Sequence, residues 1–136
     1  METPMNYIPP FESIRSMLNL TIVRGETRVA MTYEQVQQMI RTLLAGIKVD
    51  EAWYLARHED VAAEVATGAI RSAREHYIGH GFFEGRLPFS IQIDEKYYLE
   101  QNPDVAETVR RGVYASAQEH FDGPGYREGR KPFPIG

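Results

Sequence analysis

Four histidines carry most of the chemistry that this chain could perform: His58, His76, His80 and His120. His76 and His80 are four residues apart, a spacing that places two imidazoles on one face of a helix, as in some zinc sites. No aspartate or cysteine stands next to this pair, and the chain contains no cysteine at all. We therefore expect no metal site and no cofactor.

Two serine–histidine pairs also invite a catalytic interpretation, because Ser72 and His76, like Ser116 and His120, are four residues apart. Each serine, however, begins an S-x-x-E capping box, in which its oxygen binds a backbone N–H at the start of a helix. Nothing around them resembles a nucleophile elbow, and the chain has no phosphate-binding or calcium-binding loop motif. We expect no catalytic residue and no enzyme activity. His76 and His120 are predicted to be half-buried and hydrogen-bonded to backbone or carboxylate groups.

These residues occur twice because the chain contains a tandem duplication. Residues 50–89 align without a gap on residues 94–133, and 20 of the 40 aligned positions are identical. A period of this size is typical of stacked helical repeats. Each copy predicts three short helices, which begin at caps such as Asp50 and Asp94 and stop at Gly68 and Gly112. The closing hexapeptides, EGRLPF and EGRKPF, combine a turn glycine with a helix-ending proline.

Residues 1–48 contain no third copy, and their first ten residues, with three prolines, are predicted to form an extended or flexible arm. Alternating apolar and polar residues predict a hairpin with strands at 18–23 and 28–31. Thr32 then begins a capping box and an amphipathic helix that ends near Ala45 or Gly46. Its apolar stripe either packs within the chain or mediates self-association, together with or instead of the hairpin edge. The candidate self-association residues are Tyr33, Val36, Ile40, Leu43 and Ile47.

The composition narrows the choice of partners. The net charge of −4 disfavours nucleic-acid binding that depends on neutralising phosphates. No apolar run approaches the roughly 20 residues needed to span a bilayer, and the first residues do not resemble a signal peptide. We expect a cytoplasmic protein with no membrane span, although the absence of cysteine also fits export by a non-standard route.

The repeats are rich in aromatic residues, which leaves two interpretations open. Most of these side chains could fill the core of a small helical unit. Alternatively, some of them lie exposed beside arginines and form a surface for a glycan or a protein partner. The candidates for this surface are Trp53, Tyr97, Phe82, Tyr126, Arg86 and Arg130.

The segments "YLEQNPDVAETV" and "SAQEHFDGPGYREGRKP" resemble a bacterial repeat of the form YLxxNPDVxxAV…HYxxxGxxEGRxP. Such repeats are similar to segments found beside glycosyltransferases and in polysaccharide-associated or large secreted repeat proteins. The resemblance covers residues 50–133, and the first copy departs from it at His58-Glu59, where the pattern has Asn-Pro. It implies a setting in polysaccharide production or envelope assembly, and no activity for any particular residue.

Together these patterns predict a mainly α fold: two tandem three-helix repeats of about 44 residues, preceded by a β-hairpin and an amphipathic helix. The expected parts are residues 1–48, 49–89 and 90–136. The function we expect is that of a non-catalytic scaffold subunit, a homo-oligomer that contacts a glycosyltransferase or polysaccharide-synthase subunit in exopolysaccharide or cellulose-type biosynthesis. The alternatives are a glycan-binding module and a small regulatory protein that binds a nucleotide or DNA.

Overall fold

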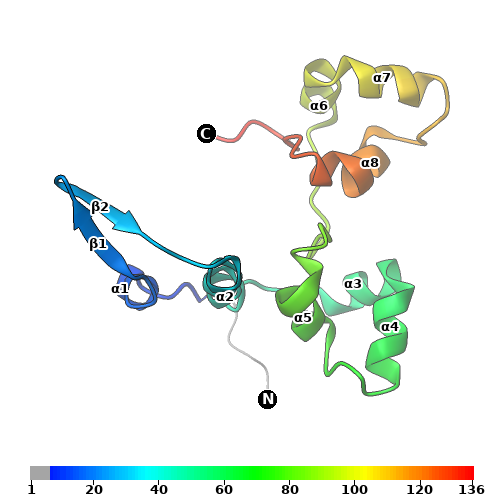
Figure 1. The fold of residues 1–136 in the computed structure, drawn as a ribbon. Helices are drawn as coiled ribbons and strands as arrows, with labels where there is room; N and C mark the ends of the chain where they lie inside the picture. The colour runs from blue at the N-terminus through cyan, green and yellow to red at the C-terminus, as the bar shows by residue number, and fades with distance from the viewer. Residues whose placement is uncertain (1–6) are drawn as a thin grey trace. The chain divides into compact units, whose positions relative to one another are not determined.

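The structure, a computed structural model, describes residues 7–136 and is mainly helical, with one two-stranded sheet (Figure 1). The chain forms two compact units, one ending at Lys48 and one running from Val49 to Gly136. The predicted mainly α fold with a preceding hairpin is confirmed. Among residues 7–136, no helix combines the length and the apolar character needed to cross a bilayer.

The hairpin of the first unit pairs β1 (Leu20–Val23) with β2 (Glu26–Val29) in antiparallel fashion, with Leu20 opposite Val29. The connecting residues Arg24 and Gly25 both have positive φ, 51° and 79°. Positive φ at both positions is the mark of a type I′ turn, whose twist matches that of the strands. The predicted strand bounds, 18–23 and 28–31, were wrong because the turn consists of these two residues and not of residues 24–27.

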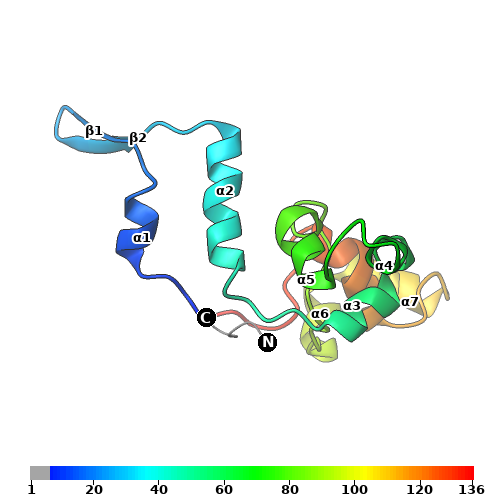
Figure 2. The same cartoon turned by 90° about the horizontal axis from the view of Figure 1, so that it is seen from below.

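Two helices flank the hairpin, and both views show them as separate elements (Figures 1 and 2). The short helix α1 (Phe11–Arg15), which the sequence patterns did not predict, follows Pro10. Residues 7–10 have no regular structure, and the rest of the predicted arm, residues 1–6, lies outside the described residues. Helix α2 (Tyr33–Leu44) begins with the predicted capping box: Thr32 Oγ1 accepts from the Gln35 N–H at 3.1 Å, and Gln35 Oε1 accepts from the Thr32 N–H at 2.9 Å.

Each repeat of the second unit contains two helices, then a third that continues into a single π-helical turn. In the first repeat these are α3 (Glu51–Arg57), α4 (Glu59–Ala66), α5 (Ala73–His76) and η1 (Tyr77–Gly81). In the second they are α6 (Glu95–Gln101), α7 (Pro103–Arg110), α8 (Ala117–His120) and η2 (Phe121–Gly125).

The predicted helix caps and helix-ending glycines are found at the predicted positions. Asp50 accepts from the Trp53 N–H, and Asp94 accepts from the Tyr97 N–H, each at 3.1 Å. The stop glycines have left-handed φ values, +81° at Gly68 and +76° at Gly112, a conformation that glycine adopts without steric cost.

The π-helical turns were not predicted, and a close approach accompanies each of them. In the first repeat the Tyr54 hydroxyl lies against the backbone of Gly81, where an added Cβ would be only 2.1 Å from the hydroxyl oxygen. In the second repeat a Cβ on Gly125 would be 2.2 Å from the Tyr98 hydroxyl oxygen. Glycine is therefore required at the end of each turn because a tyrosine occupies the space of a side chain.

The hexapeptide that closes each repeat returns the chain to the beginning of that repeat. The Asp50 N–H donates to the Pro88 carbonyl oxygen at 3.0 Å, and the Asp94 N–H donates to the Pro132 carbonyl oxygen at 2.9 Å. Gly85 and Gly129 make the preceding turn possible with φ of +78° in both copies. The duplicated hexapeptide thus serves a structural purpose: it closes each three-helix unit into a loop.

The two repeats share a core. Leu87, which belongs to the closing segment of the first repeat, is buried in one cluster with residues of the second. Trp53 of α3 also packs against this cluster. The buried members from the second repeat are Tyr98, Val105, Ala117 and Phe121. Because apolar side chains from both copies exclude water at this junction, the repeats stabilise each other.

Candidate functional site

The two buried histidines are each bound by a tyrosine. The Tyr54 hydroxyl lies 2.8 Å from His76 Nδ1, and the Tyr98 hydroxyl lies 2.8 Å from His120 Nδ1. Burial raises the pKa of Tyr54 to about 12 and lowers the pKa of His76. A protonated phenol can then donate to a neutral imidazole. His76 and His120 are thus buried, with 4% and 6% exposure, and not half-buried as predicted, and each binds a tyrosine.

The predicted carboxylate neighbour exists only as a distant contact: His76 Nε2 is 3.8 Å from a Glu84 carboxylate oxygen. His80, the other member of the predicted helical pair, is exposed, and the two rings lie 5.7 Å apart between centroids. Within residues 7–136, no three acidic or histidine side chains come close enough together to hold a metal ion. His76 Nδ1 has the Tyr54 hydroxyl as its partner.

The serines that could have been nucleophiles are helix caps. Ser72 Oγ accepts from the Glu75 N–H at 3.0 Å, and Ser116 Oγ accepts from the Glu119 N–H at 3.1 Å. In these contacts the serine oxygen is an acceptor that completes the first turn of a helix. His76 and His120, four residues after these serines, form hydrogen bonds with tyrosines and not with the serines.

The arginines of the closing hexapeptides form two-bond ion pairs with aspartates. Arg86 binds both carboxylate oxygens of Asp60, at 3.0 and 2.8 Å, and also Glu84 at 3.1 Å. Arg130 binds Asp104 in the same way, at 2.9 and 2.8 Å. Planar two-bond pairing of this kind fixes geometry as well as charge. It ties the closing turn to the second helix of the repeat.

Sequence reasoning missed Asp60 and its counterpart Asp104 as partners of these arginines. The sequence did contain a signal for these pairs, because the aspartate and the arginine are both identical in the two copies. Arg86 and Arg130, predicted as part of a partner surface, are half-buried and bound to these aspartates.

The predicted aromatic surface is only partly assembled. Trp53, Tyr97, Phe82 and Tyr126 are all half-buried. Trp53 and Tyr126 pack on the shared core, and Phe82 makes edge contacts with Tyr77 and Phe83. Tyr126 and Arg130 do come together, beside the exposed Phe133 and Ile135, in an apolar depression of about 360 Å³. The other four predicted residues do not line this depression.

The predicted self-association residues of α2 differ in exposure. Tyr33 and Leu43 are exposed, at 76% and 41%, whereas Val36, Ile40 and Ile47 are half-buried. The hairpin, in contrast, buries none of its eight strand residues. The hairpin is therefore one open apolar surface of the first unit, besides the exposed Ile8 and Phe11, and it contributed no residue to the predicted set.

Comparison with models of protein families, with curated proteins and with solved structures finds no significant match to this chain. A function for this protein therefore has to be inferred from the geometry of its described residues.

Proposed function

We propose that this protein is a non-catalytic interaction subunit that self-associates through its first unit. The observation that carries the proposal is the uncovered apolar face of the hairpin. Leu20 and Val29 face each other across the strands, and Ile22 follows on the same side, because alternate residues of a strand share a face. All three are exposed, and Ile22 is 76% exposed. An isolated two-stranded hairpin is marginally stable in water, and additional strands that extend its hydrophobic face make it more stable.

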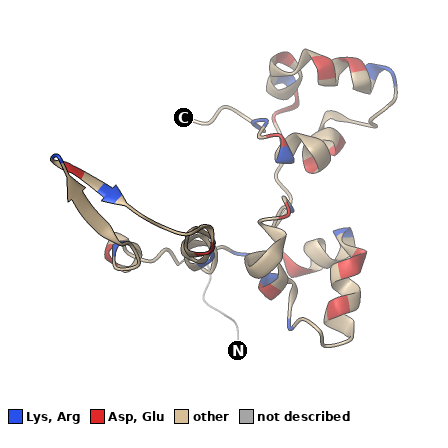
Figure 3. Ribbon diagram, viewed as in Figure 1, with Lys and Arg blue, Asp and Glu red and all other residues tan. Residues whose placement is uncertain are grey.

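The partner we propose is the hairpin of a second copy, joined along β1. Strand β1 carries no charged residue, whereas β2 carries Glu26 and Arg28 (Figure 3). Charges on an edge strand oppose pairing with another chain, so β1 is the less protected edge. Two β1 strands related by a two-fold axis would form a four-stranded sheet without placing like charges opposite one another. The sheet would also double the continuous apolar face.

The second unit supports a binding role and not a reaction. Three of the residue types that could perform chemistry are engaged in structural contacts: His76 with Tyr54, Ser72 with a backbone N–H, and Arg86 with Asp60. The same contacts recur in the second repeat. Two copies of one rigid helical unit provide a surface on which another protein can dock. The resemblance of the repeats to polysaccharide-associated segments supports placing this role in bacterial exopolysaccharide or cellulose-type biosynthesis.

The experiment compares two lysine substitutions on the two strands of the hairpin. Ile22→Lys puts a charge on β1, and Thr27→Lys puts the same charge directly opposite it, on β2. We expect the unsubstituted protein and T27K to have the same concentration-dependent mass above that of a monomer in light scattering. I22K should have the mass of a monomer, since a charge on an edge strand opposes pairing with another chain. Far-UV circular dichroism checks that both variants remain folded.

A monomeric mass for the unsubstituted protein across the concentration range would contradict the proposal, as would an I22K variant that stays oligomeric. The biosynthetic setting is tested separately, by affinity capture from the producing bacterium with mass spectrometry. Recovery of a glycosyltransferase or polysaccharide-synthase subunit supports the setting, and recovery of this protein alone contradicts it.

A further inference from the structure

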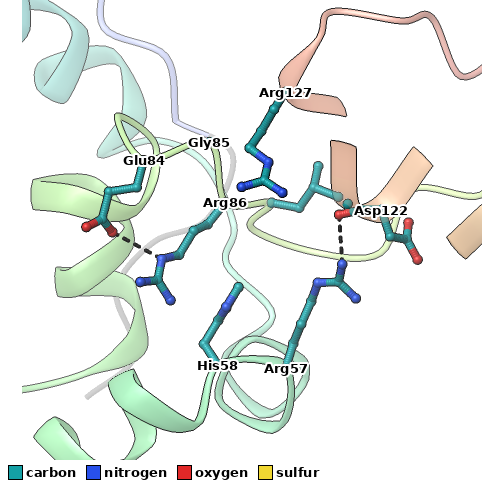
Figure 4. Close-up of a pocket in the computed structure, with 9 residues that line it drawn as sticks. Arg57, His58, Glu84, Gly85, Arg86, Asp122 and Arg127 are labelled. Atoms are coloured by element: carbon teal, nitrogen blue, oxygen red, sulfur yellow. Dashed lines mark hydrogen bonds and ion pairs between the residues drawn. The ribbon is translucent and has the colours of Figure 1, made fainter. Parts of the chain in front are cut away.

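A cleft of about 300 Å³ lies at the junction of the two repeats (Figure 4). The first repeat contributes the boundary of α3 and α4, with Arg57 and His58, and the closing turn at Gly85 and Arg86. The second repeat contributes Arg127 and the residues at the start of its π-helical turn. Figure 4 shows the side chains of Arg57, His58 and Arg127 directed into the same space.

Among residues 7–136, two of the three guanidinium groups in the cleft form no ion pair with a carboxylate. Arg86 is neutralised by Asp60 and Glu84. Arg57 donates to the backbone carbonyl oxygen of Asp122 at 2.7 Å and lies 5.5 Å from the centre of the Trp53 ring.

Arg127 forms no ion pair within the described part of the chain. The Asp122 carboxylate also lines the cleft and keeps its negative charge; it accepts from Gln118 Nε2 at 2.8 Å and forms no ion pair with either arginine among residues 7–136. The cleft consequently presents two guanidinium groups, those of Arg57 and Arg127, that no carboxylate of the described residues binds directly.

The duplication provides an internal comparison for this cleft. The position of Arg57 is occupied by Gln101 in the second copy, and that of Arg127 by Phe83 in the first. His58 corresponds to Asn102, whose Oδ1 accepts from Arg130 at 2.8 Å. In the first copy this contact is missing: His58 Nε2 is buried and has no hydrogen-bond partner among residues 7–136. Arg57, His58 and Arg127 are therefore positions where the two copies differ.

The position of Arg127 depends on a glycine of the other repeat. A Cβ on Gly85 would be 2.6 Å from Arg127 Cγ, so the arginine stem crosses directly over the glycine backbone. The corresponding Gly129 has no atom within 4 Å of such a Cβ. Gly85 thus allows a contact between the repeats that its counterpart does not make, and this contact holds the guanidinium at the cleft.

We propose that the cleft between the repeats binds the oxyanion group of a small ligand, a carboxylate or a phosphate, between Arg57 and Arg127. Guanidinium groups match both anions because their N–H donors form planar pairs with the anion oxygens. The volume accommodates a ligand the size of one acidic sugar or one phosphate ester. His58 forms the adjoining wall of the cleft.

The pKa of His58 can report on binding at this cleft. Burial, and then the charges of Arg86 and Arg57, lower the pKa of His58, while Asp60 acts in the opposite direction and His76 adds to the lowering. The ring is therefore neutral at pH 7. An anion held between Arg57 and Arg127 would favour the imidazolium form and raise this pKa.

The test is a titration of the full-length ¹⁵N-labelled protein, followed by NMR, with glucuronate and with inorganic phosphate. Glucose is the neutral counterpart of glucuronate. We expect either anion to shift the Gly85 and Gly123 amide signals and to raise the pKa of His58, and glucose to do neither. Comparing the affinities for glucuronate and phosphate shows whether the cleft prefers a carboxylate or a phosphate group.

Three variants locate the site. Arg57→Gln introduces the residue that the second repeat has at this position, and Arg127→Gln removes the opposite charge. Each should weaken binding by about tenfold, as expected for one charge-assisted hydrogen-bonding group. Arg111→Gln removes an equal charge from an exposed position after α7 and should leave the affinity unchanged. Absence of binding by both anions, or an equal loss with R111Q, would overturn the proposal.

Discussion

The contact between Gly81 and the Tyr54 hydroxyl leads to a quantitative prediction for Gly81→Ala. Both residues lie in the interior of the first repeat, where Tyr54 is fully buried. The new Cβ would be 2.1 Å from the hydroxyl oxygen, 3.3 Å from the ring carbon that carries it and 3.4 Å from His76 Nδ1. A separation of 2.1 Å is more than an ångström inside normal contact distance, and a buried ring cannot rotate away. We expect a cost near the upper end of overpacking, about 3 kcal/mol.

Substitution of Tyr54 by phenylalanine separates the cost of the steric clash with the new methyl group from the cost of losing the Tyr54–His76 hydrogen bond. Tyr54→Phe removes the hydroxyl and leaves His76 Nδ1 without its partner, which costs about 1–3 kcal/mol. In the G81A/Y54F double variant the closest obstacle to the new methyl group is gone. The combined loss should therefore be smaller than the sum of the two single losses, by about 1–2 kcal/mol.

Gly79→Ala is the matched control. Gly79 lies in the same π-helical turn, and a Cβ there would have no atom within 4 Å. We expect G79A to be as stable as the unsubstituted protein or slightly more stable, because alanine is the better helix former.

The assay is urea and thermal unfolding monitored by circular dichroism. For a unit of this size, about 3 kcal/mol corresponds to a decrease of roughly 12–24 °C in Tm. A G81A variant that melts with the unsubstituted protein would refute the close approach. Additive losses in the double variant would show that the hydroxyl is not what the methyl group meets.

Two further predictions concern pH. Arg86 lowers the pKa of Asp60 to about 2, so this pair contributes stability above the unfolded-state value of about 3.9 and loses it as the pH falls towards 2. In urea unfolding between these values, Asp60→Asn should flatten the decline and Glu59→Gln should not; an unchanged profile for D60N would contradict the pairing. Burial lowers the pKa of His76, so the unfolded chain binds more protons and the free energy of unfolding should fall as the pH drops below about 6.5. NMR titration of the His76 ring should give a pKa below that value, and a higher one would contradict its burial against Tyr54.

Much of the fold follows from residues that act within one turn of the chain. Helix caps bind a backbone N–H three residues further along the chain, as Asp50, Asp94 and Thr32 do. Gly68 and Gly112 end their helices through their own left-handed backbone conformation. Such signals are local, so sequence spacing alone identifies them. The tandem duplication is equally visible without a structure, because it is a relation between two stretches of sequence.

The partners of buried side chains could not be predicted from sequence spacing. Tyr54 binds a histidine 22 residues away, and Arg86 binds an aspartate 26 residues away, so both contacts depend on how the three helices pack. The same packing brings the tyrosine hydroxyl onto Gly81. Periodicity predicts which side of a helix is buried, but it does not say which residue of another helix lies opposite.

The sequence by itself determined the helical repeats, their ends, and the presence of a hairpin. The tertiary structure alone decided that Trp53 of the first repeat packs against the core of the second, that the hairpin strands are exposed, and that Arg57 and Arg127 line one cleft. The physical reason is the range of the interactions. Caps and turns are satisfied within a few residues, whereas exposure and charge pairing depend on what the rest of the fold places beside each side chain.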